Sequence, residues 1–356
     1  MAIIREKIRC FMVRALLVLA IIVTIAFFLY TPRIMRFFST QKSITILAWP
    51  QEIDATACAA FERETGIKVI IRYFENNEEL MIKLASGDHG IDVVMPTDYA
   101  AQELIKRGLL KKLDKSRLSF MHTLDARLLG HYFDANNDYT IPYYWGVYGL
   151  GFDKDYFGDT LPISSWRMIF DRRFKSAHIA VPDNARYLVL IAARYLFGTI
   201  DNLDNERMER INNYLIAQKP TVELYTESRG EYLLASKESR LVVLLSADVA
   251  KVMKHVPRIG FTIPDEGSFM LIDSFALSAY TDKEDLVYTF LNYLYRPEVL
   301  QVYVDKFMFF PATTNVKVSF QPKELELSPE LYKKLDFYRN VIPKSVLNDI
   351  WIGLKS

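Results

Sequence analysis

Short apolar runs alternate with amphipathic stretches along the chain from residue 43 to about residue 110. The apolar runs have the length of buried strands, and the stretches between them have the spacing of helices. We predict strands at Ser43–Trp49, Lys68–Phe74 and Ile91–Pro96, and helices at Asp54–Thr65, Asn77–Ser86 and Tyr99–Arg107. Strand–helix repetition at this spacing predicts a parallel sheet with right-handed crossovers.

A glycine- and aromatic-rich segment, Ile141–Phe152, interrupts this alternation. Glycines in such a strand indicate bending or close backbone approach, so we expect the chain to cross here into a second lobe. The second lobe is predicted to contain strands at His178–Val181, Val222–Tyr225, Leu241–Leu245 and Arg258–Ile263, with helices at Ala185–Phe197, Glu206–Ala217, Gly230–Ala235 and Ala247–Val252. The apolar run Phe269–Ala279 then returns the chain to the first lobe, and helices follow from Asp282 through Lys306. Two lobes joined by two crossings predict a hinge and a cleft.

The first 42 residues carry seven basic residues and one acidic residue, together with an uninterrupted apolar run at Ala15–Tyr30. A basic stretch followed by an apolar run is typical of a secretory signal or a signal-anchor. The run is slightly shorter than the ~20 residues of a spanning helix, and no small-residue cleavage site follows it. Cleavage and retention as an anchor therefore both stay open, and either places the body outside the inner membrane.

The composition fits a globular body of about two domains, with 356 residues of which 51% are apolar and 24% charged. The whole chain has a net charge of +1, so the basic leader leaves a mildly acidic body. This balance argues against nucleic acid as a partner and favours cationic ones. Cys58 has small apolar neighbours and is interpreted as a buried helical residue, with a reactive thiol as the alternative.

The sequence lacks the motifs of the common enzyme classes. It has no G-x-S-x-G elbow, no P-loop, and no G-x-G-x-x-G after a strand. Its histidines do not have metal-ligand spacing: His89, His122, His131, His178 and His255. We therefore predict no catalytic residue, no metal site and no cofactor.

Trp49 ends the first predicted strand and is the first candidate for ligand contact. Ligands of open α/β sheets gather at the carboxyl ends of strands, and aromatic faces attract cations. The alternative is that Trp49 belongs to the hydrophobic core.

Seven segments between residues 43 and 340 share their patterns with a known family: AWPQEI at 48–53, FERETGIKVIIRYFENNEEL at 61–80, IDVVMPTDYAAQELIKRGLLKKLDKSRL at 91–118, NNDYTIPYYWGVYGLGFD at 136–153, ISSW at 163–166, LIDSFALSA at 271–279 and LNYLYRPEVL at 291–300. Through them the chain resembles the bacterial extracytoplasmic polyamine-binding proteins, of the spermidine/putrescine type, of ABC importers. The ETGIKV and NDYxIPYxWG patterns are fairly specific to this branch.

The resemblance implies an α/β fold of the two-lobed, type II periplasmic-binding-protein kind, in which each lobe is a mixed sheet flanked by helices. The expected lobes are residues 43–149 with 274–316, and residues 150–273 with 317–356, after a leader at 1–42. The implied function is a monomeric periplasmic receptor that closes on a polyamine and delivers it to an ABC permease in the inner membrane. The leader would contact the membrane.

The family holds a polyamine with aromatic side chains along its methylenes and carboxylates at its ammonium ends. Trp49, Thr97, Tyr99 and Asp273 retain the family's pattern, whereas other positions depart from it. Two family acids become Asn184 and Tyr187, another becomes Gln51, the cleft tyrosine becomes Phe310, and Leu245 and Leu271 replace tryptophans. The candidate ligand-binding residues are Trp49, Gln51, Thr97, Tyr99, Asn184, Tyr187, Glu227, Asp248, Asp273 and Phe310.

The acidic candidates have structural alternatives. Asp273 lies inside an apolar run, where an unpaired carboxylate is costly, so we expect a cationic partner from the ligand or from an internal Arg or Lys. Asp248 begins a helix and could serve its dipole, and Thr97 could cap the helix that follows it. Glu52 and Glu227 are interpreted as surface charges.

Two carboxylates, Asp248 and Asp273, match a diamine better than a triamine. The lost acids and the leucines leave two alternatives for the function. One keeps the fold but binds another small amine or nutrient, and the other is a membrane-tethered sensor or adaptor domain.

Overall fold

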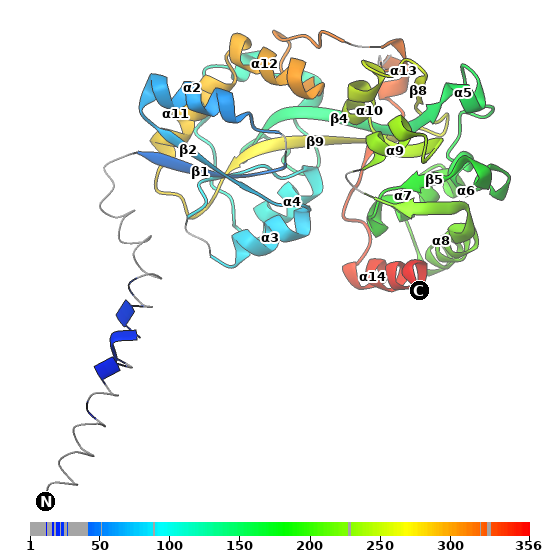
Figure 1. Cartoon of the computed structure of the whole chain (residues 1–356), viewed down its shortest axis with the longest axis horizontal. Helices are drawn as coiled ribbons and strands as arrows, with labels where there is room; N and C mark the ends of the chain where they lie inside the picture. Colours follow the sequence, from blue (N-terminus) through cyan, green and yellow to red (C-terminus); the bar gives the residue numbers. More distant parts are fainter. Residues whose placement is uncertain are drawn as a thin grey trace, which may run out of the picture.

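The computed structural model describes residues 42–50, 52–87, 90–226, 229–320, 322–325 and 329–356, together with scattered positions between residues 12 and 27. Two α/β lobes lie side by side and are joined by two long strands (Figure 1). The two-lobed α/β fold expected from the sequence is confirmed. The prediction for the leader at 1–42 falls almost entirely outside the described residues.

The first lobe is built on three parallel strands, with β1 (Ser43–Ala48) between β2 (Lys68–Tyr73) and β3 (Val93–Val94). Its helices are α2 (Ala55–Thr65), α3 (Asn77–Ala85), α4 (Asp98–Lys106), α11 (Glu284–Leu294) and α12 (Pro297–Phe307). Figure 1 shows α2, α11 and α12 on one face of this sheet, and α3 and α4 on the other. Asp54 caps α2 by accepting from the amide of Thr56, and Gly66 ends it in the left-handed conformation that glycine favours.

The second lobe repeats the parallel pattern, with β5 (Ile179–Val181) between β6 (Val222–Tyr225) and β7 (Leu241–Leu245). The strand β8 (Ile259–Thr262) pairs antiparallel with the crossing strand β4 (Thr140–Asp153). Its helices are α5 (Lys154–Phe157), α6 (Arg167–Phe170), α7 (Ala185–Phe197), α8 (Asn205–Gln218), α9 (Gly230–Ser236), α10 (Ser246–Met253) and α14 (Lys344–Lys355).

Two antiparallel strands, β4 (Thr140–Asp153) and β9 (Ser268–Leu277), connect the lobes, and all their residues are buried. β4 pairs with β9 as far as Val147 and then with β7 from Tyr148. The sheet is therefore continuous, in the order β2-β1-β3-β9-β4-β7-β5-β6. The crossing expected at Ile141–Phe152 is confirmed, and the residue limits of the lobes stay a prediction.

Most predicted elements are confirmed to within two residues at each end, but the third strand is shorter than expected. The predicted strand Ile91–Pro96 is reduced to β3, Val93–Val94. Pro96 has no amide hydrogen to continue the ladder. The short strands β10 (Phe310–Pro311), which pairs with β4, and β11 (Leu335–Phe337), which pairs with β9, have no counterpart in the sequence prediction, and neither does α14.

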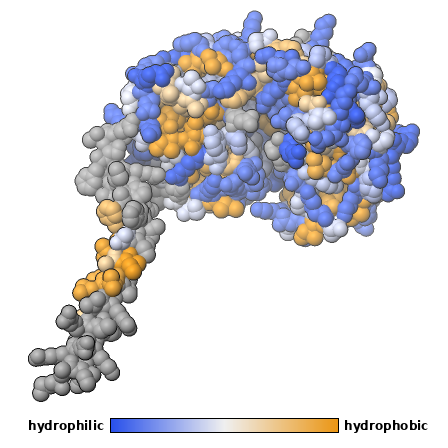
Figure 2. Space-filling model, viewed as in Figure 1, coloured by the Kyte–Doolittle hydropathy of each residue, from blue (hydrophilic) through white to orange (hydrophobic). Residues whose placement is uncertain are grey.

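The surface of both lobes is mostly polar on the face shown in Figure 2. Cys58 is 6% exposed in α2, and burial raises the pKa of its thiol to about 11, which confirms the interpretation as a buried helical residue. Within the described part of the chain, no helix combines the length and apolarity that crossing a bilayer requires.

Gly149 in β4 offers a direct test of the packing at the crossing. A Cβ there would lie 2.4 Å from Cζ of Phe261 and 2.7 Å from the carbonyl oxygen of Thr262. We expect Gly149→Ala to lower the free energy of unfolding by about 2–3 kcal/mol, because backbone cannot move aside as a flexible side chain does. Urea unfolding measures this change.

The matched control is Gly353→Ala in α14, where the nearest heavy atom would be 4.0 Å from the new Cβ. This substitution is expected to leave stability unchanged or to raise it by up to about 1 kcal/mol, because alanine favours the helix. Equal stability of the two variants would contradict the packing described for β4.

Candidate functional site

The carboxyl ends of the parallel strands in both lobes lead to the residues of the candidate site. Trp49 and Glu52 follow β1, Thr97 follows β3, and Asp248 follows β7. Each lobe thus contributes the strand edge at which open α/β sheets bind ligands. The charges of Asp248 and Lys251 influence the pKa of Glu52, so the two edges lie within electrostatic range of one another.

Glu52 and Asp273 form a buried acidic pair against the first lobe, although the lobe limits expected from the sequence assign Asp273 to the second. Asp273 is 2% exposed, and in the β4–β9 ladder it lies opposite Tyr144. The hydroxyl of Tyr144 donates a hydrogen bond to Oε1 of Glu52 and also lowers the pKa of Asp273. The backbone of Glu52 is held in turn, because Tyr143 donates to its carbonyl oxygen at 3.3 Å.

Polar atoms of the acidic pair lack hydrogen-bond donors. Oε2 of Glu52 is buried without a hydrogen-bond partner. Oδ1 of Asp273 and Nε1 of Trp49 are also buried and make no hydrogen bond of normal geometry, although the indole N–H lies close enough to lower the pKa of Asp273. Among the described residues, no Lys or Arg forms an ion pair with Asp273, so the internal partner considered for it is not found. Buried carboxylate oxygens without donors are costly, and this cost would be removed by a ligand that donates hydrogen bonds.

The pKa values of the pair reflect this environment. Burial raises the pKa of Asp273 to about 8, with a further increase from the nearby Asp98, while Tyr144 and Trp49 oppose it. Burial and the charge of Asp273 likewise raise the pKa of Glu52 well above its ordinary value. Burial and mutual proximity therefore both favour the protonated forms of these two carboxyls in the empty site. A bound cation would take the place of a proton.

Three charged residues of the second lobe, Glu231, Asp248 and Lys251, form what we call the charged triad. Nζ of Lys251 lies 3.1 Å from Oδ1 of Asp248, one turn earlier in α10. Burial opposes the charge of Lys251, but Asp248, Glu231 and Glu52 together raise its pKa. Burial and Asp248 raise the pKa of Glu231. The triad carries two carboxyl groups and one internal ammonium.

Leucine side chains lie between the acidic pair and the charged triad. Leu271 is the ladder partner of Gly146, and a Cβ on Gly146 would lie 2.8 Å from Cδ1 of Leu245. Leu245, Leu271 and Gly146 therefore form an apolar surface beside the crossing. A small cavity of about 30 Å³ adjoins this surface, with Leu245, Glu231 and Asp248 in its wall. Its volume is that of about one water molecule.

Arg186 of α7 lies across the cleft against the first lobe. Its guanidinium carbon is 4.7 Å from the ring centre of Tyr99, and it lowers the pKa of Asp98. Burial nevertheless raises the pKa of Asp98 to about 7. Asp98 already accepts from the amides of Tyr99 and Ile272, at 2.6 and 3.3 Å, and from the hydroxyl of Tyr132. These internal partners distinguish Asp98 from the acidic pair.

The structure places some sequence candidates directly at the acidic pair. Trp49 is half-buried, and its ring lies 4.4 Å from that of Phe74, so it borders both core and cleft. Thr97 forms a backbone bridge with Asp273, and its hydroxyl accepts from Asn77 at 2.5 Å. Thr97 occupies the N-cap position of α4, where its carbonyl oxygen accepts from the amide of Ala101, but its side chain makes no capping bond.

Other candidates are occupied by local packing. Asn184 accepts from the amide of Arg186 and caps α7, and Tyr187 stacks on Tyr338 at 4.0 Å. Phe310 is buried 5.1 Å from the ring of Trp145. Gln51 and Glu227 lie outside the described residues.

Glu52 is the main residue that the sequence analysis missed. Its interpretation as a surface charge is wrong, because its Oε2 atom is buried and its carboxyl adjoins Asp273. The available signal was its position three residues after Trp49, in the loop at the carboxyl end of β1.

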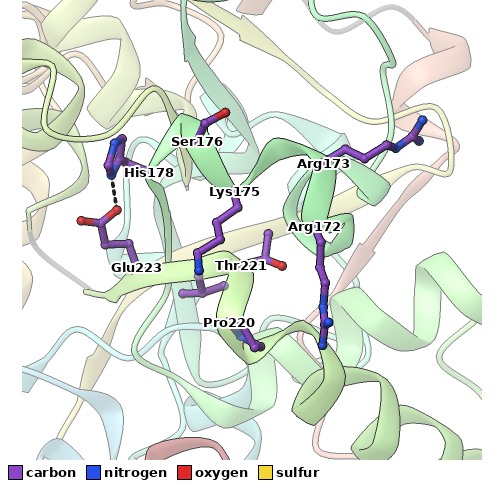
Figure 3. Close-up of a pocket in the computed structure, with 9 residues that line it drawn as sticks. Arg172, Arg173, Lys175, Ser176, His178, Pro220, Thr221 and Glu223 are labelled. Atoms are coloured by element: carbon purple, nitrogen blue, oxygen red, sulfur yellow. Dashed lines mark hydrogen bonds and ion pairs between the residues drawn. The ribbon is translucent and has the colours of Figure 1, made fainter.

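A cavity of about 590 Å³ lies elsewhere on the second lobe, between η4 (Arg172–Ala177) and the segment before β6 (Figure 3). Arg172, Arg173 and Lys175 line it, and His178 pairs with Glu223 at its edge. Its basic side chains repel cations, so the cavity does not suit an amine. Within the described residues, no cluster of three His, Cys, Asp or Glu side chains is arranged to hold a metal ion.

Comparison with known proteins supports the family resemblance seen in the sequence. The family model for bacterial extracellular solute-binding proteins matches residues 56–331. The putrescine-binding periplasmic protein PotF of Escherichia coli (strain K12) is 28% identical over 315 residues, covering 83% of this chain and 84% of PotF. The spermidine/putrescine-binding periplasmic protein of Salmonella typhimurium is 29% identical over 262 residues, covering 73% and 75%.

A solved structure also shares the fold. The putative spermidine/putrescine ABC transporter protein from Listeria monocytogenes superposes with a TM-score of 0.80 at 24% identity, covering 88% of this chain and 99% of that one. Together with the family model, which spans more than half of the sequence, this places the chain. It belongs to the bacterial extracellular solute-binding proteins, a family of receptors rather than enzymes.

Proposed function

We propose that the chain is the extracytoplasmic receptor of an ABC importer and that it binds a polyamine of the putrescine or spermidine type between its lobes. The observation that carries this proposal is the buried acidic pair, Glu52 and Asp273, with an unpartnered oxygen on each residue. An ammonium group supplies both the hydrogen bonds and the charge that these oxygens lack. The names of the relatives, which are putrescine- and spermidine/putrescine-binding proteins, support the same ligand class.

In this proposal the cleft holds the two ends of the ligand differently. One ammonium is bound by the acidic pair beside Trp49, and the methylenes lie over Leu245 and Leu271. The second ammonium is bound at the carboxylates of the charged triad. Because the pair and the triad belong to different lobes, the ligand stabilises the closed form and shifts the population toward it. The permease would recognise that form.

We also propose a periplasmic location and a monomeric state for the body, with the leader contacting the inner membrane. The sequence features of residues 1–42 and the periplasmic location of the relatives support this location. A second candidate function keeps the receptor role but changes the ligand to another small amine. The leucines at positions 245 and 271 favour it, since they offer no aromatic face to a polyamine.

Calorimetric titration tests the ligand class. Purified protein is titrated with putrescine, cadaverine, spermidine and spermine, and we expect saturable binding of at least one of them. Glu52→Gln is expected to weaken that binding at least about tenfold, because a charge-assisted hydrogen bond is lost. Glu298→Gln on the exposed start of α12 is the matched control and should bind normally. If none of the amines binds to the wild-type protein, the polyamine proposal is wrong.

Asp273→Asn tests two effects of the buried carboxyl separately: its effect on the free energy of unfolding and its contribution to ligand binding. The variant should bind the amine more weakly by about 1.5 kcal/mol or more. The free energy of unfolding of the ligand-free protein at pH 8 should rise by about 1–3 kcal/mol, since a buried charge is removed. Asp282→Asn, on an exposed residue, serves as the control for both measurements. Weaker binding accompanied by lower stability would instead indicate a damaged fold.

The raised pKa of the pair predicts how binding depends on pH. The carboxyls hold protons in the empty site below the pKa of about 8 at Asp273, and they must release a proton to pair with an ammonium. The affinity should therefore rise from pH 6 to pH 8, by up to about tenfold per pH unit, and level off above that range. Calorimetry in buffers of different ionisation enthalpy should also detect proton release. An affinity that falls across this window would refute the assignment.

A further inference from the structure

We infer that Lys251 is a specificity-determining residue whose side chain occupies one cation position of the cleft and restricts the ligand to a diamine. The inference rests on the proposed function and adds to it the number of ammonium groups that the cleft accepts. Lys251 is an ammonium on a four-carbon chain, which is the chemical unit from which polyamines are built. The side chain of Lys251 therefore resembles an aminobutyl group of a longer polyamine, but it is covalently part of the protein.

The placement of Lys251 supports this role. Its ammonium lies 3.1 Å from Oδ1 of Asp248, and the side chains of the two residues are 34% and 33% exposed. It also interacts electrostatically with Glu231 of its own lobe and with Glu52 across the cleft. The next lysine along the same helix, Lys254, is exposed and has no such surroundings among the described residues. Lys251 therefore pairs with Asp248 and lies within electrostatic range of Glu231 and Glu52.

The charges of the triad and of the acidic pair limit how many ligand ammonium groups the cleft can neutralise. The charged triad has two carboxylates and one ammonium, so it can neutralise one ligand ammonium. The acidic pair holds two adjacent buried carboxyls that share the hydroxyl of Tyr144, and such neighbours favour a state with one negative charge. The pair therefore neutralises the other ammonium of the ligand.

A third ammonium has no free carboxylate within the described part of the cleft. Asp98 is occupied by backbone amides, Tyr132 and Arg186. A triamine in the wild-type cleft would therefore place one cation near Lys251, and repulsion between like charges would lower its affinity. Selectivity obtained by repulsion against the wrong ligand is a general feature of specific sites.

Calorimetric titration with putrescine and spermidine tests the inference in the wild-type protein and in Lys251→Gln, Lys251→Met and Lys254→Gln. Wild type should bind putrescine more tightly than spermidine. Both Lys251 variants should shift the ratio of the two affinities toward spermidine by at least tenfold, because a carboxylate of the triad becomes free. Lys254→Gln should keep the wild-type ratio. Lys251→Met retains the length of the side chain without its charge, and thermal unfolding verifies that each variant is folded.

The outcomes separate this inference from the function on which it rests. An unchanged affinity ratio in both folded Lys251 variants, with putrescine still bound, overturns the role of Lys251 and leaves the polyamine receptor standing. Wild-type protein that prefers spermidine overturns it as well. If the wild-type protein binds neither amine, the proposed function fails and the inference fails with it.

Discussion

The candidate site depends on one unfavourable arrangement, the burial of the carboxyls of Glu52 and Asp273 beside each other without an ion-pair partner among the described residues. An isolated buried charge is costly, so the empty protein holds protons on this pair, as the raised pKa of both residues indicates. The same cost makes the site receptive to an ammonium, which provides both charge and hydrogen bonds. Affinity for a cation and instability of the empty site therefore have one cause.

The fold keeps this arrangement in place through strand pairing. Asp273 cannot move away from the pair, because its backbone lies between Tyr144 of β4 and Thr97 after β3. Glu52 is held by Tyr143 and Tyr144, neighbours on the same strand. Since β4 and β9 also carry the chain into the second lobe, the strands that fix the acidic pair are those that connect the lobes. Ligand binding and lobe movement thus involve the same backbone.

The sequence was sufficient for the fold and for half of the site. Periodicity located the main helices and strands of both lobes but not α5, α6, α14, β10 or β11, and Asp273 was recognisable because it interrupts an apolar run. The position of Glu52 after β1 was visible in the sequence, but its burial was not, since that depends on tyrosines about 90 residues away. Tyr187 was chosen by its position in the family pattern, whereas its stacking on Tyr338 depends on the return of the C-terminal segment. Contacts between distant segments leave no local signal in a single sequence.

The acidic pair and the charged triad differ in the internal partners of their carboxyls. This difference makes the two ends of the cleft unequal for a ligand cation. In the second lobe, Lys251 neutralises a carboxylate from within, so that end is partly satisfied before any ligand arrives. In the first lobe, the acidic pair has the hydroxyl of Tyr144 and the nearby indole of Trp49 but no ion-pair partner among the described residues. A ligand cation therefore gains most by entering at the acidic pair. In the proposed mechanism, closure of the second lobe brings the triad, with its reduced charge, to the other end of the ligand, where it would distinguish ligands by their number of charges.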